Sequence, residues 1–428
     1  MSEPNISDSE PQTASSSLPS SRLQLTIFLL IVAYLAYQRF AERFLSKSSK
    51  LTEDPTHTAQ VAASAAALDT LTSAAQEHPI PPIEHIHAGA AENKSHSWIK
   101  KCIPDAVLND YESRYHMGNY VIDRETGEKT FEQMSIYVRL GMHLLYYGSR
   151  QAQLLHVKRV QDILHQQSVK MGESYDSPAS KAHIKPFLDS FQLWDTMHEM
   201  KKPDPNHYEN FNEFFAREIR PEARPIHEPE NELVTSSPAD CRLTAFPTVD
   251  LATRYWIKGF GFTLERLFDD IELAQYFDGG SIAIARLAPQ DYHRWHAPVS
   301  GTVDYVKKIP GTYYTVNPQA INEEGTLNVF AENRRDVMVM HRPVTGNKIA
   351  VVAVGAMLVG SIKWNPGMEE PGFSIKRGEC QGAFQYGGST VIVVYPKDEV
   401  VLDHDLVRNS TEHQCETVVK VGWRIGGK

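Results

Sequence analysis

The C-terminal half of the chain is a series of short apolar runs separated by Gly, Pro and Asp. Seven of these runs predict strands, at residues 243–246, 255–257, 281–287, 301–306, 348–354, 389–395 and 417–421. No long helical pattern alternates regularly with them, which favours a mainly antiparallel sheet. Between residues 98 and 200, apolar residues recur instead at spacings of three and four, which predicts a helical region. We therefore expect an α+β fold, with a helical N-terminal layer on a mainly antiparallel β core at residues 201–428.

The N-terminal part contains one apolar segment of a different kind. Residues 1–22 are polar and rich in Ser and Pro, which predicts a disordered tail, and residues 23–37 then read LQLTIFLLIVAYLAY. As a helix this run covers about 22 Å, against about 30 Å for the hydrocarbon core of a bilayer, and flanking residues can extend it. We expect a membrane anchor helix at residues 23–40. A cleaved signal peptide and an interfacial or buried helix are the alternatives.

The charges around this segment predict its orientation. Four basic residues follow it within residues 39–50, whereas Arg22 alone precedes it, so the positive-inside rule places the C-terminal part in the cytosol. The N-terminus contains acids and is not rich in Arg, which favours an endomembrane over the mitochondrial inner membrane as the alternative. Residues 41–97, rich in Ala, Thr, His and Pro, predict a linker.

Composition narrows the classes of partner. The 428 residues are 41% hydrophobic and 22% charged, as in globular proteins. The formal net charge of −10 argues against nucleic acid as a partner, because phosphate binding needs clustered Lys and Arg. It does not argue against a lipid substrate, since local patches matter more than the total. The four cysteines form no C-x-x-C pair and predict reduced thiols in an intracellular compartment, with neither a disulfide framework nor a metal site.

Four segments of the C-terminal half carry the candidate chemistry. They are SSPADCR with Asp240, SIAIARLAPQDYHRWHAPVSG with His293 and His296, VVAVGAMLVGSI, and AFQYGGSTVIVVYP with Gly388 and Ser389. Each alone has a plainer explanation, because an Asp or a Gly-Gly-Ser stretch is usually a turn and a metal pair would need further ligands nearby. A hydrolase nucleophile is disfavoured at Ser389, because the G-x-S-x-G elbow is absent and the serine opens a strand rather than a helix.

Taken together and in order, five stretches resemble the motif set of the phosphatidylserine decarboxylase family. They are FFAREIRPEARPI, SPAD, DYHRWHAP, VGAMLVGSI and GGST, and the similarity runs from about residue 210 to the C-terminus. The flanking sequence most resembles the fungal members. Two departures from the family pattern are Cys241, where many members have Gly, and the stretch around Cys380. We expect neither departure to touch a catalytic group.

The resemblance implies a mechanism as well as a fold. The chain would cut itself between Gly388 and Ser389, and Ser389 would become a pyruvoyl group, the cofactor. His296 would be the base that activates Ser389, and Asp240 would orient His296. The ketone would serve as the electron sink for decarboxylation, with His293 assisting decarboxylation and reprotonation. No metal is implied.

The function implied is conversion of phosphatidylserine to phosphatidylethanolamine and carbon dioxide. The partners are then a phospholipid substrate and a membrane but no nucleic acid, the two self-cleavage fragments stay associated, and a homodimer is left open. One alternative is a pyruvoyl-dependent decarboxylase of a small (aromatic) amino acid, which would not need the apolar segment. Another is a non-enzymatic membrane-bound relative, against which the intact Asp240, His296 and Ser389 argue. Acyl-chain preference and phosphate-binding residues are not predicted.

Overall fold

The structure is a computed structural model that describes residues 119–132, 169, 172–257, 262–314, 316, 328–356, 362–385 and 389–428. The predicted tail (1–22), anchor (23–40) and linker (41–97) lie outside the described residues. In the ranges that are described, no helix combines the length and the apolar character needed to cross a membrane.

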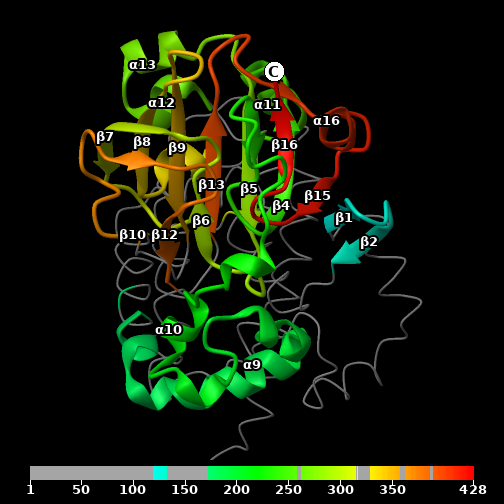
Figure 1. Cartoon of the computed structure of the whole chain (residues 1–428), viewed down its shortest axis with the longest axis vertical. Helices are drawn as coiled ribbons and strands as arrows, with labels where there is room; N and C mark the ends of the chain where they lie inside the picture. The colour runs from blue at the N-terminus through cyan, green and yellow to red at the C-terminus, as the bar shows by residue number, and fades with distance from the viewer. Residues whose placement is uncertain are drawn as a thin grey trace, which may run out of the picture. The chain divides into compact units, whose positions relative to one another are not determined.

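One ten-stranded sheet dominates the described part of the chain (Figure 1). Its strand order is β11-β7-β8-β9-β13-β5-β4-β15-β1-β2. All neighbours pair antiparallel except β1 and β15, which pair parallel, so the predicted α+β class with a mainly antiparallel sheet is confirmed. The strands are β1 (Asn119–Asp123), β2 (Lys129–Glu132), β4 (Cys241–Phe246), β5 (Ile282–Leu287), β7 (Gly301–Ile309), β8 (Arg335–Arg342), β9 (Asn347–Gly355), β11 (Ser374–Ile375), β13 (Ser389–Val394) and β15 (Glu416–Val419).

Two three-stranded antiparallel sheets accompany the large one, in the orders β10-β12-β6 and β14-β16-β3. The first of them matters for function, because β6 carries the histidine segment. The strands are β3 (Val234–Ser236), β6 (Arg294–His296), β10 (Ile362–Trp364), β12 (Cys380–Phe384), β14 (Val401–Leu402) and β16 (Arg424–Gly427).

Strand β13 shows why the large sheet is apolar on both faces. Side chains alternate across a strand, so Val391 and Val393 enter one core together with Trp295 of β6. Ile392 and Val394 enter the other core, to which α11, α12 and α13 contribute. Burial on both faces removes the usual alternation of apolar and polar residues and accounts for the continuous run VIVV.

The helices are short. They are α9 (Ile184–Phe191), α10 (Phe211–Phe215), α11 (Val249–Tyr255), α12 (Leu264–Phe268), α13 (Ile271–Tyr276), α15 (Val329–Glu332) and α16 (His404–Thr411), with 3-10 turns η2 (Pro178–His183), η3 (Trp194–Glu199), η4 (Pro205–His207) and η5 (Pro221–Ala223). A third core is rich in aromatic residues of α9 and α10, and it also takes in Tyr292 and Val421. This core packs the FFAREIR segment against the loop that carries the histidines.

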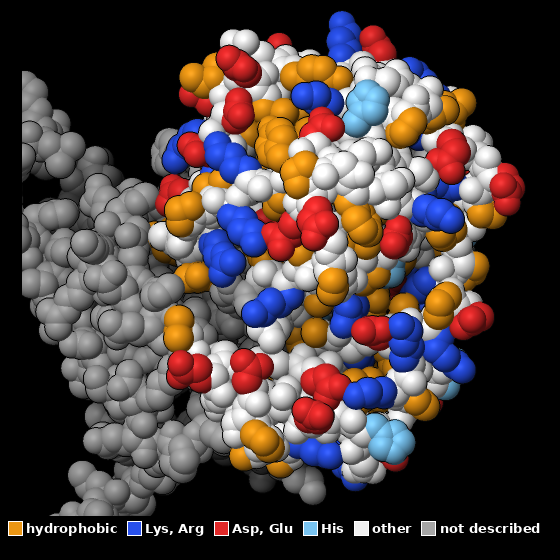
Figure 2. All heavy atoms as spheres, turned by 60° about the vertical axis from the view of Figure 1, so that its left-hand side comes forward, with side chains coloured by type: hydrophobic (Ala, Val, Ile, Leu, Met, Phe, Trp, Pro, Cys, Tyr) orange, Lys and Arg blue, Asp and Glu red, His pale blue; other side chains and the backbone are white. Residues whose placement is uncertain are grey.

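The surface shows charges of both signs close together. On the face seen in Figure 2, Lys and Arg side chains are interspersed with Asp and Glu. Exposed ion pairs such as Lys308–Glu369, at 2.6 Å, belong to this kind of surface. Pairs of this type contribute roughly 0–1 kcal/mol each, so the fold depends on its cores and on the buried pairs described below.

Six of the seven predicted strands are present within a few residues of their expected positions, but residues 255–257 are not a strand. Tyr255 is the last residue of α11. The helix begins where the Thr248 hydroxyl accepts the backbone N–H of Leu251 at 3.3 Å. A side-chain cap of this kind starts a helix, and the prediction for the apolar run that follows was wrong because it overlooked the cap.

Within the predicted helical region 98–200, residues 119–132 form a β-hairpin instead. Asp123 Oδ1 accepts two backbone N–H groups of the turn, at 2.9 and 2.8 Å. Gly127 adopts φ +70°, a conformation that glycine takes without strain. The turn and the β-branched residues before it therefore override the helical pattern here. Residues 169 and 172–200 contain helical elements, and the rest of this region lies outside the described residues.

Candidate active site

The four candidate segments meet at one edge of the large sheet. β5 ends at Leu287 and β9 ends at Gly355, and both are register partners of Ser389, the first residue of β13. β4 begins directly after Asp240 and pairs antiparallel with β5, so its first residue lies at the same edge. The loop that leads to His293 leaves from this edge as well. The topology thus gathers residues that are far apart in the sequence.

Ser389 is fully buried, and its hydroxyl has no hydrogen-bond partner among the described residues. It lies on the same face of β13 as Val391 and Val393, toward the core that includes Trp295. A buried hydroxyl without a partner costs about 1–3 kcal/mol, so the fold itself gains nothing from this oxygen. Gly388, the other half of the predicted cleavage bond, lies outside the described residues.

His296 has both ring nitrogens engaged. Nδ1 lies 2.8 Å from the Gly378 carbonyl oxygen, and Nε2 lies 3.1 Å from the Tyr292 hydroxyl. A carbonyl can only accept, so in the neutral ring Nδ1 carries the proton and Nε2 accepts from Tyr292. Burial raises the pKa of Tyr292 well above its usual value, which keeps the phenol protonated. Nε2 is therefore the nitrogen that can take up a proton.

Asp240 is tied to the segment of His296, but its carboxylate is bonded elsewhere. It accepts from Arg224 Nε at 3.0 Å and from the backbone N–H of Val421 at 2.8 Å. The backbone N–H of His296 donates to the Pro238 carbonyl at 2.7 Å, which joins the two segments. Among the contacts described for these residues, none links the carboxylate of Asp240 directly to the imidazole of His296.

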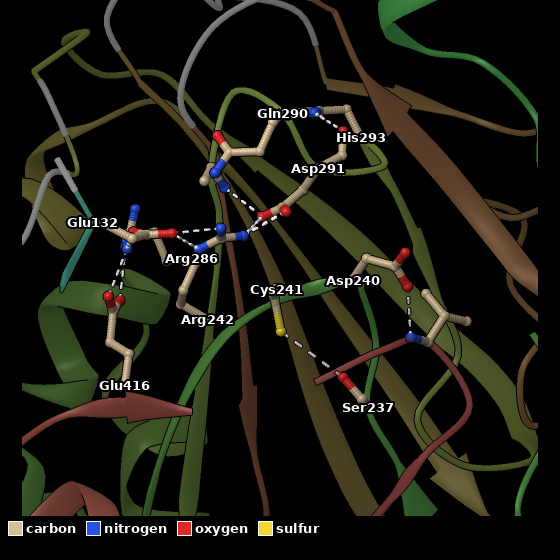
Figure 3. A network of polar contacts seen from close by, with 12 residues as sticks. Glu132, Ser237, Asp240, Cys241, Arg242, Arg286, Gln290, Asp291, His293 and Glu416 are labelled. Carbon is tan, nitrogen blue, oxygen red and sulfur yellow. Dashed lines mark hydrogen bonds and ion pairs between the residues drawn. The ribbon is translucent and has the colours of Figure 1, made fainter. Parts of the chain in front are cut away.

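His293 is buried at the end of the loop that follows β5. Its Nδ1 lies 2.9 Å from the carbonyl oxygen of Asp291, a contact drawn in Figure 3. Its ring lies against Phe215 of α10, with 3.9 Å between the ring centroids. The same Asp291 oxygen accepts a second hydrogen bond from Arg217 at 3.2 Å. The loop and α10 together fix the orientation of the imidazole.

A cluster of buried charges supports this loop (Figure 3). Arg242 contacts the Asp291 carboxylate, and its Nε lies 2.6 Å from Glu132 Oε1. Arg286 Nε lies 2.7 Å from Glu416 Oε1, and its Nη2 lies 3.3 Å from Glu132 Oε2. Burial alone would raise the pKa of Glu132, but the charges of both arginines lower it below its usual value. Glu132 therefore joins the β1–β2 hairpin to the active-site loop.

Replacing Glu132 by Gln is expected to lower the free energy of unfolding by about 2–4 kcal/mol at neutral pH, because two buried guanidinium groups lose a shared carboxylate. The folded pKa of Glu132 is lowered, so its contribution is present above the unfolded pKa and is lost as the pH falls through the folded value. The difference between the two proteins should shrink in acid. Denaturant unfolding at several pH values measures it. Glu125→Gln, at an exposed position of the same hairpin, is the control.

Sequence reasoning missed the position of Cys380 beside a candidate catalytic residue, because it was expected to touch no catalytic group. In the structure Cys380 on β12 is the register partner of His296 on β6. Its Sγ lies 3.9 Å from Arg294 Nη1. Burial alone would raise the pKa of this thiol, but the neighbouring His296 and Arg294 lower it to about 7. The sequence does not predict this proximity, because it depends on the register between β12 and β6.

Alkylation by iodoacetamide is expected to reach half its maximal rate at Cys380 near pH 7, because the thiolate is the reactive form. Cys241 is the internal comparison, since it is fully buried and burial raises the pKa of its thiol. Peptide-resolved mass spectrometry across pH 5–10 measures both rates. A half-maximal pH near 9 at Cys380 would contradict the assignment, and Cys380→Ser checks that the labelled peptide is the correct one.

The sequence of this chain is similar to those of known proteins over most of its length. A family model described as phosphatidylserine decarboxylase matches residues 211–427, which include all the predicted site residues. The chain is 44% identical over 311 residues to phosphatidylserine decarboxylase proenzyme 3 of Schizosaccharomyces pombe, covering 72% of this chain and 31% of that protein. It is 40% identical over 337 residues to proenzyme 2 of Oryza sativa subsp. japonica, covering 78% and 53% respectively. It is 36% identical over 307 residues to the proenzyme of Fusobacterium nucleatum, covering 72% and 97%.

The chain thus spans about a third to a half of the length of these fungal and plant relatives, and nearly the whole of the bacterial one. All of these relatives are called proenzymes. The identities extend the similarity well beyond the short motifs from which it was first predicted.

Proposed function

Because this chain belongs to the phosphatidylserine decarboxylase family, as its motifs predict, we propose that it is a self-processing, pyruvoyl-dependent enzyme that converts phosphatidylserine to phosphatidylethanolamine and carbon dioxide. One observation carries the proposal. The hydroxyl of Ser389 is fully buried without a hydrogen-bond partner among the described residues, at the sheet edge where the loops of His293 and Asp240 also start.

The surroundings of Ser389 fit the formation of a pyruvoyl group. Its Oγ attacks the carbonyl carbon of Gly388, and the peptide nitrogen becomes an amine, so that an ester replaces the amide. Loss of the Ser389 α-proton then expels the Gly388 carboxylate and leaves dehydroalanine. Tautomerisation and reaction with one water release ammonia and leave the ketone, so no oxidant is needed. The hydroxyl need not give up a described hydrogen bond before it reacts.

His296 is the proposed base for the first step. Its Nδ1–H is held by the Gly378 carbonyl, which leaves Nε2 to accept the proton of Ser389. Nε2 now accepts from Tyr292, so the transfer either replaces that contact or passes through the phenol. Asp240 is proposed to orient His296, which requires its carboxylate to give up part of its contact with Arg224.

His293 is proposed to act in the decarboxylation itself. The pyruvoyl ketone supplies the electron sink that accepts the pair released when carbon dioxide leaves. The Asp291 carbonyl holds His293 in the Nδ1–H tautomer, so Nε2 is the atom that exchanges a proton with the product carbon. The apolar ring of Phe215 on His293 keeps water away from that side of the imidazole.

The sheet order supports association of the two fragments after cleavage. The C-terminal fragment begins with β13, which lies between β9 and β5 and pairs with both over six residues. It also supplies β15, which pairs with β4 and β1. Cleavage at residue 389 therefore leaves the new fragment inside the sheet, where its buried side chains retain their packing.

The proposed location is a membrane, through the segment 23–40, with the catalytic part on the cytosolic side of an endomembrane. The charge pattern of residues 22–50 supports this orientation. Protease treatment of sealed microsomes tests it, because a cytosolic catalytic part is digested without detergent. Protection of residues 201–428 until detergent is added would place this part in the lumen instead.

The direct test of the function uses the purified full chain and phosphatidylserine labelled in the serine carboxyl group. Labelled carbon dioxide is expected from this lipid and not from free serine or aromatic amino acids. Borohydride treatment should abolish the release, because it reduces the ketone. Release from an aromatic amino acid alone would favour the alternative substrate class, and release that resists borohydride would exclude a catalytic ketone.

A further inference from the structure

Arg217 is a buried cation without an ion pair among the described residues. Its exposed fraction is 4%, and its Nη1 has no hydrogen-bond partner in the part of the chain that is described. Most other buried arginines, such as Arg242 and Arg286, contact carboxylates directly. Arg335 and Arg377 lack a carboxylate too. All three nitrogens of Arg335 donate to backbone carbonyls, whereas both Nη nitrogens of Arg377 donate and only its Nε lacks a partner among the described residues. In the part of the chain that is described, the Nη1 donor of Arg217 is therefore left without a partner.

The guanidinium of Arg217 lies beside the proposed decarboxylation base. Its Nη2 donates to the carbonyls of Gln290 and Asp291, both at 3.2 Å, and the Asp291 oxygen is the one that also holds His293. The ring of Phe214 lies 5.1 Å from its Cζ. Burial lowers the pKa of Arg217, and the charges of neighbouring acids offset this only in part. Among the described residues, Arg217 thus has no direct carboxylate partner, and its guanidinium lies next to the loop of His293.

We propose that Nη1 of Arg217 binds the phosphodiester of the phosphatidylserine headgroup. This inference rests on the proposed function, since it assigns a contact within that substrate. A desolvated guanidinium is a strong partner for a phosphate oxygen. The phosphodiester is one carbon and one oxygen away from the reacting α-carbon. A phosphate held by Arg217 would thus place the α-carbon close to His293.

The substrate carboxylate is the other anion that could reach this cation, and the chemistry disfavours it. The carboxylate loses its charge as carbon dioxide leaves. An ion pair with it would stabilise the ground state more than the transition state and would slow the reaction. The phosphodiester keeps its charge throughout, so its contact with Arg217 binds and orients the substrate without raising the barrier.

Substitution of Arg217 by Gln and by Lys tests the proposal, with Arg220→Gln as the matched control. Arg220 belongs to the same segment but is exposed and donates to the carbonyl of His198. The ligands are short-chain dihexanoyl phosphatidylserine as substrate and dihexanoyl phosphatidylethanolamine, which has the phosphodiester but no carboxylate. Calorimetry measures binding of the second lipid to the processed protein, and a denaturing gel checks self-cleavage.

Arg217→Gln should still cleave itself, while its KM for the serine lipid and its Kd for the ethanolamine lipid both rise about 10- to 100-fold, the effect of one charge-assisted hydrogen bond. Its kcat should change much less, Arg217→Lys should recover part of the affinity, and Arg220→Gln should behave as the unaltered chain. If Arg217→Gln does not fold, the KM and Kd of Arg217→Lys are compared with those of the unaltered chain instead, and a smaller rise in both is expected.

Two results would overturn the proposal. A raised KM with unchanged binding of the ethanolamine lipid would assign Arg217 to the carboxylate. A lower kcat with unchanged KM and Kd would show that Arg217 only holds the loop of His293. Failure of the proposed function looks different, because the unaltered chain would then release no carbon dioxide from the serine lipid. Binding of the ethanolamine lipid would still report on Arg217 in that case.

Discussion

A Ser389→Ala chain is expected to remain one polypeptide of 428 residues and to release no carbon dioxide from phosphatidylserine, whereas the unaltered chain splits into a large fragment and one of about 40 residues. Without the hydroxyl, nothing attacks the Gly388 carbonyl and no ketone forms. Stability should not fall, because the lost oxygen is buried without a described partner and its removal relieves a desolvation penalty of about 1–3 kcal/mol. Intact-mass analysis and thermal unfolding measure the two expectations.

Thr390→Ala is the matched control for this experiment. Its hydroxyl is also buried, also lacks a partner in the described structure, and belongs to the adjacent residue of β13. Because side chains alternate across a strand, it points to the opposite face of the sheet from Ser389. Thr390→Ala should therefore cleave normally. Splitting of the Ser389→Ala chain at the same bond would rule out the proposed chemistry, and failure of both variants to split would point to a packing defect instead.

Sequence reasoning predicted the strands well because both faces of the large sheet are buried. A continuous apolar run such as residues 389–395 has few conformations that hide every side chain, and the turns around it mark its ends. The same reasoning failed at residues 119–132 and at 255–257. In both places a short polar contact, at Asp123 and at Thr248, decides the local conformation against the wider pattern.

The sequence indicates candidate site residues but not the contacts that they make. Order along the chain indicates Asp240, His293, His296 and Ser389, and the sheet gathers their segments at one edge. The order of residues along the chain does not indicate that Arg224 holds the carboxylate of Asp240. Contacts of this kind follow from strand register and crossovers, which bring distant strands together. The pattern of residues along the sequence does not predict them.

The pairing of Cys380 with His296 is a second contact that the sequence could not predict. Nothing in the sequence around residue 380 indicates a histidine, and the two residues meet only because β12 lies beside β6. The buried cluster is a third case, since Glu132 reaches Arg242 and Arg286 across more than a hundred residues of sequence. Its hairpin lies outside the region that the family model matches, yet it supports the loop of His293.

A His296→Ala chain is expected to cleave itself at least about 100-fold more slowly, because a serine hydroxyl is a weak nucleophile unless a base takes its proton. In the proposed mechanism Nε2 is that base, because Nδ1–H donates to the Gly378 carbonyl. Freshly synthesised chain, followed over time on a denaturing gel, measures the rate of cleavage. Tyr292→Phe tests the route of the proton, since cleavage that persists without the phenol excludes a relay through it.

His293→Ala distinguishes the proposed role of His293 in decarboxylation from that of His296 in self-cleavage. Its ring is fixed by Asp291 and Phe215 and is proposed to act after the ketone exists, so this chain should split at a normal rate and release little carbon dioxide. The two variants thus have opposite signatures: an intact chain for His296→Ala, and a split but inactive one for His293→Ala. If His293→Ala also remained intact, the loop after β5 would serve cleavage as a whole. If His296→Ala split normally, another group would have to deprotonate Ser389, and the division of labour between the two histidines would be refuted.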